Sequence, residues 1–317
     1  MGITVIRYYE DKGSRWGIVK GENVLPIPGN YETLSSFLDE GRNVAKEVLE
    51  VNNGEMKKLD ELQIMSPVTQ PARVVCQGLN YSDHREETGS ASKPFYNLFF
   101  TKADSSLTGP YNEIIRPKHV ELLDYEIELG LIIGKPITEA VQVSKDNLHE
   151  YIAGLVITND ISARDVQVSQ EQYFKGKSYR TFCPTGPFLY LLDEEDIPFI
   201  DDLDIKLSVN GEIRQSSNTK HLTFKPYETL TEMSELMDLS PGDVVLTGTP
   251  GGVAINYNKE IAQELLLTDK DKKEVFLDSQ IGNESYLKDG DLIRSEIKSP
   301  NGRIDLGVQE NRIVGQY

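Results

Sequence analysis

The chain has 317 residues, with 33 Lys and Arg, 51 Asp and Glu, and a formal net charge of −18. This length is ample for a buried core and allows one large domain or two unequal ones. A surface this acidic repels phosphate backbones and anionic lipid headgroups, so we expect neither nucleic acid nor a membrane as a partner. The sequence also shows no membrane-spanning apolar run, no signal-peptide pattern and only 2 cysteines, which predicts a cytoplasmic protein.

Residues 1–66 predict a small N-terminal α+β domain. Thr4–Tyr9 and Trp16–Val19 are apolar or alternating segments between turn residues, as short strands are. Apolar positions between Tyr31 and Val51 fit one face of a helix. The proline-containing stretch 66–73 then predicts a linker.

Residues 67–317 predict a larger, strand-rich domain. Asn210-Gly211 and Asn301-Gly302 predict two-residue hairpin turns, because Asn and Gly tolerate positive φ. The strongest candidate strands are Val74–Gln77, Glu126–Ile133, Gly154–Thr158, Ile205–Val209, Val244–Thr247 and Leu292–Ile297.

Three helices are predicted in this larger domain. Ser144 is expected to cap a short helix that includes Leu148 and Ile152. Thr229–Leu239 predicts a second helix, which ends before a Pro-Gly pair, and Lys259–Leu267 a third.

Two glutamates alternate with apolar residues in the segment Glu126–Ile133. In a strand, residues i and i+2 share a face, so Glu126 and Glu128 should point the same way, about 7 Å apart at Cα. The simple interpretation is a solvated strand face. The same face continues with Gly130 and Ile132, however, which favours partial burial and therefore a metal ion or hydrogen-bonding partners for the carboxylates.

Other candidate groups are ambiguous when each is taken alone. Asp160 ends an apolar strand and could be a helix cap or a metal ligand. Arg164 and Asp165 fit a structural ion pair or groups that orient a ligand. His84 and Glu87 are spaced to share a helix face, where the carboxylate could orient a histidine that acts as a general base, although an incidental surface pair is as simple an interpretation.

Two further segments carry candidate substrate contacts. Lys177 follows a Lys-Gly pair and could stabilise an enolate or oxyanion in a closed site. Thr249 lies in the glycine-rich stretch LTGTPGGV, where backbone N–H groups and its hydroxyl could meet a ligand oxygen. A surface lysine and a structural turn are the simpler alternatives.

The order and wording of five blocks resemble one known family. GLNYSDHREE, LDYEIELGLIIGK, TNDISARDVQ, KGKSY with CPTGP, and LSPGDVVLTGTPGGV are together similar to the fumarylacetoacetate hydrolase family, over about residues 73–253. The resemblance implies an α+β fold with a rolled mixed β-sheet, a small N-terminal domain and a homodimer. The stretch Ile255–Tyr286 is longer than in short members, and the sequence assigns it no role.

The resemblance also implies roles for single residues. Glu126, Glu128 and Asp160 match the metal ligands, which suit Mg²⁺ or Mn²⁺ because all three are carboxylates. His84, Glu87 and Lys177 match catalytic residues, the first two on a lid. Thr249 matches a substrate contact, and Tyr81 is also expected to contact substrate. Arg180 departs from the family, since many relatives carry an acidic or small residue there, and it is expected to contact substrate and affect substrate choice.

The function implied by the resemblance is metal-dependent cleavage of a C–C bond in an anionic 2-oxo or 1,3-dicarbonyl acid. Acylpyruvate hydrolysis or oxaloacetate decarboxylation is the first expectation. Isomerase, decarboxylase or hydratase action in homoprotocatechuate-type aromatic catabolism is the alternative. A non-catalytic metal- or ligand-binding protein on the same fold is the alternative of another class.

Overall fold

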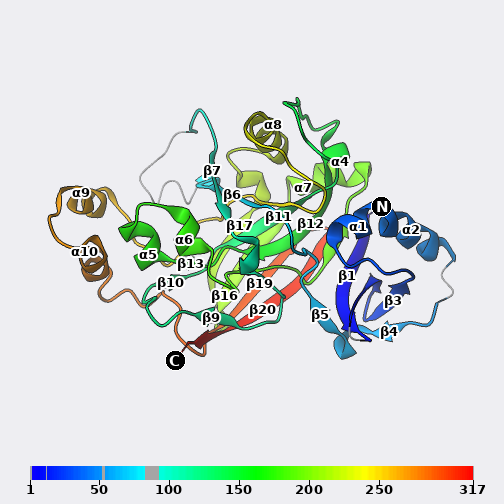
Figure 1. Ribbon diagram of the computed structural model, residues 1–317, viewed down its shortest axis with the longest axis horizontal. Helices are drawn as coiled ribbons and strands as arrows, with labels where there is room; N and C mark the ends of the chain where they lie inside the picture. Colours follow the sequence, from blue (N-terminus) through cyan, green and yellow to red (C-terminus); the bar gives the residue numbers. More distant parts are fainter. Residues whose placement is uncertain (1, 12, 52–53, 83–92, 317) are drawn as a thin grey trace.

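The computed structural model of the chain describes residues 2–11, 13–51, 54–82 and 93–316 (Figure 1). Within them, two mixed β-sheets form the framework, one of 11 strands and one of five, and helices lie around them. The strands of the main sheet, in spatial order, are β4 (Lys57–Lys58), β3 (Asn23–Ile27), β2 (Gly13–Lys20), β1 (Ile3–Glu10), β15 (Leu189–Leu191), β12 (Ile152–Asn159), β11 (Ile127–Ile133), β18 (Val244–Leu246), β6 (Val74–Gly78) and β7 (Leu98–Lys102), with β5 (Gln63–Met65) also paired to β1.

The second sheet has the order β17 (Glu212–Asn218), β16 (Asp204–Val209), β19 (Leu292–Lys298), β20 (Asp305–Gly315) and β9 (Ile114–Arg116). Two short pairs complete the strands, β10 (Leu123–Asp124) with β13 (Ser162–Ala163) and β8 (Leu107–Thr108) with β14 (Cys183–Pro184). The α+β class is confirmed, and all six strand segments predicted for residues 67–317 lie in or overlap strands.

The antiparallel strands β11 and β12 run through the middle of the main sheet. Every residue of both strands is buried, because side chains on both faces are covered by other parts of the chain. This explains the continuous apolar character of the two segments, which is typical of strands buried on both faces. The ends of these two strands carry the acidic residues predicted to bind metal.

Residues 1–66 continue the same sheet. Strand β1 pairs with β15, so Val5 lies opposite Leu189, and the N-terminal strands extend the sheet of the larger region (Figure 1). Side chains from both parts also share one hydrophobic cluster. The division into two domains at residue 66 stays a prediction.

The helix expected between Tyr31 and Val51 is present in three parts: α1 (Leu34–Ser36), a π-helical turn (Phe37–Gly41) and α2 (Arg42–Val51). It begins at Leu34 because the Thr33 side chain accepts a hydrogen bond from the Ser36 N–H and so caps the first turn. Phe37 stacks on Trp16 with ring centroids 4.0 Å apart, which attaches this helix to the sheet.

Some of the predicted turns and helices need correction. The helix predicted to be capped by Ser144 is only α4 (Leu148–Tyr151), and its N-cap is Asn147 instead. Ile152 lies outside it and begins β12, where it pairs with β11. The Asn210-Gly211 turn is a two-residue hairpin with φ of 52° and 84°, as predicted. Asn301-Gly302 is not, since residues 299–304 form a wider loop closed by a hydrogen bond from the Ser299 N–H to the Ile304 carbonyl.

The remaining helices are α5 (Arg164–Ser169), α6 (Tyr173–Lys177), α7 (Ile197–Ile200), α8 (Pro226–Leu236), α9 (Lys259–Leu267) and α10 (Lys272–Ser279). Helix α9 has the predicted bounds, whereas α8 differs from the prediction at both ends. It starts earlier because Pro226 occupies its first turn, and it ends at Leu236 because Leu239 pairs instead with Ile137. Figure 1 shows α5, α6, α9 and α10 together at one end of the molecule, opposite the N-terminal strands. In the described part of the chain, we find no helix with the length and apolar character needed to cross a membrane.

Candidate active site

Three buried carboxylates meet where β11 and β12 pair. Glu126 directly precedes β11, Glu128 lies within it, and Asp160 directly follows β12. The Asp160 N–H donates to the Glu126 carbonyl at 2.8 Å, which continues the pairing and brings the two side chains together. A carboxylate oxygen of each residue lies within 4.8 Å of the others. The expectation that Glu126 and Glu128 share a partly buried face is therefore correct, and Asp160 joins them from the neighbouring strand.

Three buried cations surround these carboxylates. The Lys177 ammonium donates to Glu126 Oε2 at 2.9 Å and to Asp160 Oδ2 at 2.6 Å. Arg164 donates to Asp124 Oδ2 at 2.7 Å and to Glu126 Oε1. Lys102 donates to Asp160 Oδ1 and to the carbonyl oxygens of Ile161 and Phe182.

The cluster therefore has one more acid than base, since Asp124, Glu126, Glu128 and Asp160 face Lys102, Arg164 and Lys177. The Glu128 carboxylate experiences this excess of negative charge. Burial and the charges of Asp160 and Glu126 raise the pKa of Glu128 well above its usual range, against the opposing effects of Lys177 and the Gly248 N–H. A proton or a cation would relieve this repulsion. Three carboxylates without a His or Cys ligand suit a hard cation such as Mg²⁺ or Mn²⁺, so the residues present fit the predicted metal.

Lys177 stays charged in this site. Burial lowers its pKa, but Asp160 and Glu126 more than reverse that effect, so the pKa of Lys177 is raised. Its position is set by the short helix α6, whose first turn is capped by Gln172, and by the Phe100 ring, whose centroid lies 5.3 Å from the ammonium nitrogen. Lys177 can thus donate hydrogen bonds to a developing negative charge.

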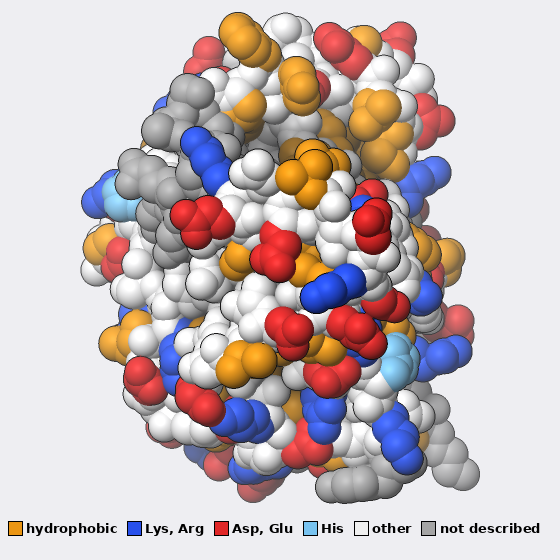
Figure 2. Space-filling view, turned by 90° about the vertical axis from the view of Figure 1, so that its left-hand side faces the viewer, with side chains coloured by type: hydrophobic (Ala, Val, Ile, Leu, Met, Phe, Trp, Pro, Cys, Tyr) orange, Lys and Arg blue, Asp and Glu red, His pale blue; other side chains and the backbone are white. Residues whose placement is uncertain are grey.

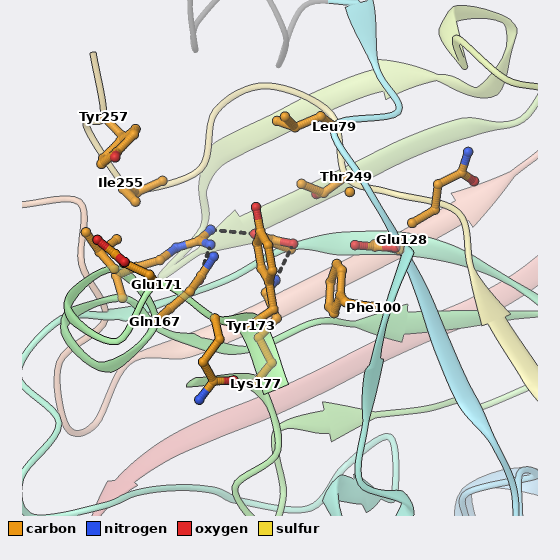
Figure 3. Close-up of a pocket in the computed structure, with 16 residues that line it drawn as sticks. Leu79, Phe100, Glu128, Gln167, Glu171, Tyr173, Lys177, Thr249, Ile255 and Tyr257 are labelled. Carbon is orange, nitrogen blue, oxygen red and sulfur yellow. Dashed lines mark hydrogen bonds and ion pairs between the residues drawn. The ribbon is translucent and has the colours of Figure 1, made fainter. Parts of the chain in front are cut away.

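The cluster opens into a cavity of about 460 Å³ (Figure 3). Glu126, Glu128, Arg164, Lys177 and Thr249 contribute to its walls. The other described lining residues are Gln77, Gly78, Leu79, Phe100, Gln167, Val168, Glu171, Gln172, Tyr173, Ile255 and Tyr257. A ligand in this cavity can reach Glu126, Glu128 and the Lys177 ammonium together, whereas Asp160 is fully buried behind them and is not among the described lining residues.

Residues 73–314 match the family described as "Fumarylacetoacetate (FAA) hydrolase C-terminal". The chain belongs to the fumarylacetoacetate hydrolase family. The resemblance read from the five sequence blocks is confirmed, and with it the membership of an enzyme family whose members process small organic acids.

Named relatives differ in the reaction that their names state. A bovine (Bos taurus) protein named "Oxaloacetate tautomerase FAHD2A, mitochondrial" is 33% identical over 89% of this chain and 80% of its own length. The crystal structure of fumarylacetoacetate hydrolase from Exiguobacterium antarcticum is 29% identical, with a TM-score of 0.76 over 99% of this chain and 100% of its own. The structure of a probable 2-hydroxyhepta-2,4-diene-1,7-dioate isomerase from Mycobacterium abscessus is 28% identical, with a TM-score of 0.74 over the full length of both chains.

Thr249 lies where the family resemblance predicts a substrate contact. It lines the cavity, and its hydroxyl donates to the Ile127 carbonyl at 2.9 Å and accepts from Gln215 Nε2 at 2.8 Å. These two hydrogen bonds hold the hydroxyl close to the carboxylate cluster.

Tyr81 and Arg180 have other surroundings. Tyr81 is fully buried, Arg180 is exposed, and neither belongs to the described residues that line the cavity. Their predicted substrate contacts therefore have no support from the cavity as described. His84 and Glu87 lie outside the described residues, so their predicted catalytic roles stay predictions.

Arg164 and Asp165 do not pair with each other. Arg164 binds Asp124 and Glu126, which makes it an orienting group for a predicted metal ligand. Asp165 forms its ion pair with Lys273 at 3.1 Å. The sequence interpretation missed Lys102 entirely, because a lysine at the end of an apolar strand gives no sign that its ammonium is buried.

Proposed function

We propose that the protein is a metal-dependent enzyme that cleaves a C–C bond in a 2-oxo or 1,3-dicarbonyl acid, with an acylpyruvate as the first candidate substrate. The observation that carries the proposal is the buried trio Glu126, Glu128 and Asp160 beside a charged Lys177 at the wall of the cavity. Such a site suits a reaction in which an enolate forms and needs fixed positive charge.

The chemistry divides between the ion and the protein. When bound by the trio, Mg²⁺ or Mn²⁺ supplies a Lewis acid for the 2-oxo group and the adjoining carboxylate. Lys177 donates a hydrogen bond to the oxygen that becomes negative, and Arg164 holds Glu126 in place. Cleavage of an acylpyruvate breaks the bond between C3 and C4: water adds to the C4 carbonyl, the bonding electrons pass to C3, and a carboxylic acid and pyruvate enolate result.

Water attack needs a general base. We assign this role to His84, oriented by Glu87, on the family resemblance alone. Decarboxylation of oxaloacetate needs no added water, so it would place less demand on this pair. The His84→Ala substitution should therefore reduce acylpyruvate hydrolysis more than oxaloacetate decarboxylation.

Tautomerisation of oxaloacetate is the second candidate. The name of the bovine relative supports it, because the similarity to that protein extends over 89% of this chain. Tautomerisation passes through the enolate of oxaloacetate itself: a C3–H bond breaks and an O–H bond forms at C2, with no C–C cleavage. The charge on the C2 oxygen would be stabilised by Lys177 and by an ion held by the same trio. The isomerase named for the Mycobacterium abscessus structure would use an enolate too.

The test is turnover of a panel of 2-oxo acids by the full chain with Mg²⁺ or Mn²⁺. Pyruvate release from acetylpyruvate and oxaloacetate, and loss of the enol absorbance of oxaloacetate, distinguish cleavage from tautomerisation. Glu126→Ala should abolish activity and metal binding together. Activity that survives in a strong chelator would contradict metal dependence, and bound metal with no turnover across the panel would favour a binding protein. The predicted homodimer and cytoplasmic location are separate proposals.

A further inference from the structure

The cavity has two chemically different ends. Glu128 lies at one end, and Figure 3 shows Ile255 and Tyr257 at the other, on the same side as Glu171. Val168 belongs to that second end, because it packs with Ile255 and Tyr257 against a common apolar cluster. We call this end, defined by Val168, Ile255 and Tyr257, the distal wall.

Most of the distal wall comes from the stretch Ile255–Tyr286, to which the sequence assigned no role. Helices α9 and α10 of this stretch form a small core of their own from Ile261, Leu265, Val275 and Phe276. Ile255 and Tyr257 precede α9 and pack against this core, while their partly exposed side chains face the cavity. The stretch thus builds part of the candidate active site as well as covering the surface.

Polar contacts attach this stretch to the charged cluster. The Ala254 and Ile255 N–H groups donate to the two oxygens of Asp124, at 2.7 and 3.2 Å, and Asp124 is the partner of Arg164. On α10, Lys273 forms an ion pair at 3.1 Å with Asp165, which lies next to Arg164 in α5. The distal wall is therefore held in a fixed relation to the groups that would bind the 2-oxo acid.

The path between the two ends is largely aromatic. Phe100, which lies near the Lys177 ammonium, stacks on Tyr173 with ring centroids 4.8 Å apart. Tyr173 lines the cavity between Glu128 and the distal wall (Figure 3). A substrate that extends from the carboxylate cluster would thus pass the rings of Phe100 and Tyr173 on its way towards Tyr257 and Ile255.

A second carboxylate on the substrate would find little support at the distal wall. Among the described residues that line the cavity, only Arg164 and Lys177 are cationic, and each already contacts two carboxylates. The charged lining residue on the side of the distal wall is Glu171, whose carboxylate is ion-paired with Lys272, so this pair offers no net positive charge to an anion. A cavity of about 460 Å³ is also larger than a four-carbon acid needs, and it falls among pockets that hold drug-sized ligands.

We propose that Val168, Ile255 and Tyr257 form a subsite for an uncharged apolar or aromatic tail, so that the enzyme prefers long-chain or aryl acylpyruvates to dicarboxylates such as oxaloacetate. The proposal rests on the function proposed above and assigns a role to the stretch Ile255–Tyr286. Each methylene group that the subsite buries should raise kcat/KM about fourfold until the wall is reached.

The first test measures kcat/KM with Mn²⁺ for acylpyruvates with methyl, propyl, pentyl and phenyl tails, and for oxaloacetate. Ile255→Asp should lower the pentyl and phenyl values at least tenfold more than it lowers the methyl value. Ile255→Ala should act in the same direction with a smaller effect. Ile281→Asp is the matched control, because Ile281 lies in the same stretch but is 82% exposed, and it should leave every value unchanged.

A second test separates the subsite from the reaction. Calorimetry with the Mn²⁺-loaded protein compares 2-oxo acids that cannot be cleaved: pyruvate, 2-oxooctanoate and the dicarboxylate 2-oxoglutarate. Tightest binding of 2-oxooctanoate, lost in Ile255→Asp and kept in Ile281→Asp, supports the subsite even if no acid in the panel turns over. Two results would overturn the subsite and leave the proposed function standing. One is turnover that does not depend on tail length, and the other is binding of 2-oxoglutarate that is as tight as or tighter than that of 2-oxooctanoate.

Discussion

The Lys102 ammonium donates a hydrogen bond to the Asp160 carboxylate at 2.5 Å, and neither side chain is exposed to solvent. Lys177 takes the other oxygen of the same carboxylate. Asp160 is thus held between two lysines, and Lys102 is further tied to the Ile161 and Phe182 carbonyls. The pair therefore fixes the orientation of a predicted metal ligand.

Lys102→Met should weaken Mn²⁺ binding at least tenfold and lower the melting temperature. The change leaves a buried carboxylate oxygen and two carbonyls without this donor, and breaking a buried ion pair costs about 3–5 kcal/mol. Calorimetry and thermal denaturation measure the two effects. Lys206→Met, at an exposed lysine of β16, is the control and should leave both values unchanged. Unchanged Mn²⁺ affinity in a folded Lys102→Met protein would show that Lys102 does not position Asp160.

Metal removal should destabilise the native chain and have little effect on Glu128→Gln. Bound ion at a hundredfold excess over its Kd adds about 2.7 kcal/mol to the free energy of unfolding. In Glu128→Gln the neutral side chain relieves the repulsion from Asp160 and Glu126 while removing one ligand. Its metal-free form should therefore be at least as stable as the native metal-free protein, and added Mn²⁺ should raise its melting temperature less.

The control for this measurement is the exposed Glu139, changed to Gln. Its melting temperature should match that of the native chain at every Mn²⁺ concentration. An equal rise in melting temperature for Glu128→Gln and the native protein would remove Glu128 from the ligand set.

Gly248→Ala should also reduce metal affinity. Gly248 has a φ of +91°, its N–H donates to Glu128 Oε2 at 2.6 Å, and an added Cβ would lie 2.8 Å from Asn80 Cβ. Relief of that contact must move the N–H that orients Glu128. Gly290→Ala is matched in strain, with a φ of +94° and no atom within 4 Å of the added Cβ. In both variants the left-handed backbone should lower the free energy of unfolding by about 1–2 kcal/mol. Only Gly248→Ala should also bind Mn²⁺ more weakly. Equal Mn²⁺ affinity in the two would count against this role for Gly248.

The sequence predicted the carboxylate trio because it depends on local pattern. Alternation in one strand places Glu126 and Glu128 on one face, and the family blocks identify Asp160 at the end of another. The ion pairs that surround them join residues far apart in the chain, such as Lys102 and Asp160, and have no periodic signature. The distal wall was missed for a similar reason, since Ile255 and Tyr257 lie in irregular chain and gain their role only when α10 packs on α5.

The start of helix α8 should account for a measurable part of the loss of folding stability at low pH. Burial alone would raise the pKa of Glu228, but the hydrogen bond from the Lys225 N–H and the ion pair with Lys93 outweigh it and lower the pKa below its ordinary value of 4.5. A carboxyl whose pKa is lower in the folded state stabilises the fold above its unfolded pKa, and that stability is lost as the pH falls through the folded pKa. The contribution of the Glu228 charge to the free energy of unfolding should therefore be lost below about pH 4.5.

Glu228→Gln tests this assignment by urea denaturation between pH 7 and pH 3. Near neutral pH the variant should be less stable than the native chain by about 0.5–2 kcal/mol, the usual cost of losing a helix cap. The two stability curves should converge as the pH falls, because protonation removes the same charge from the native protein. Glu235→Gln, at an exposed position of the same helix, should run parallel to the native curve. Curves for Glu228→Gln that stay parallel to the native curve down to pH 3 would show that the Glu228 charge does not stabilise the start of α8.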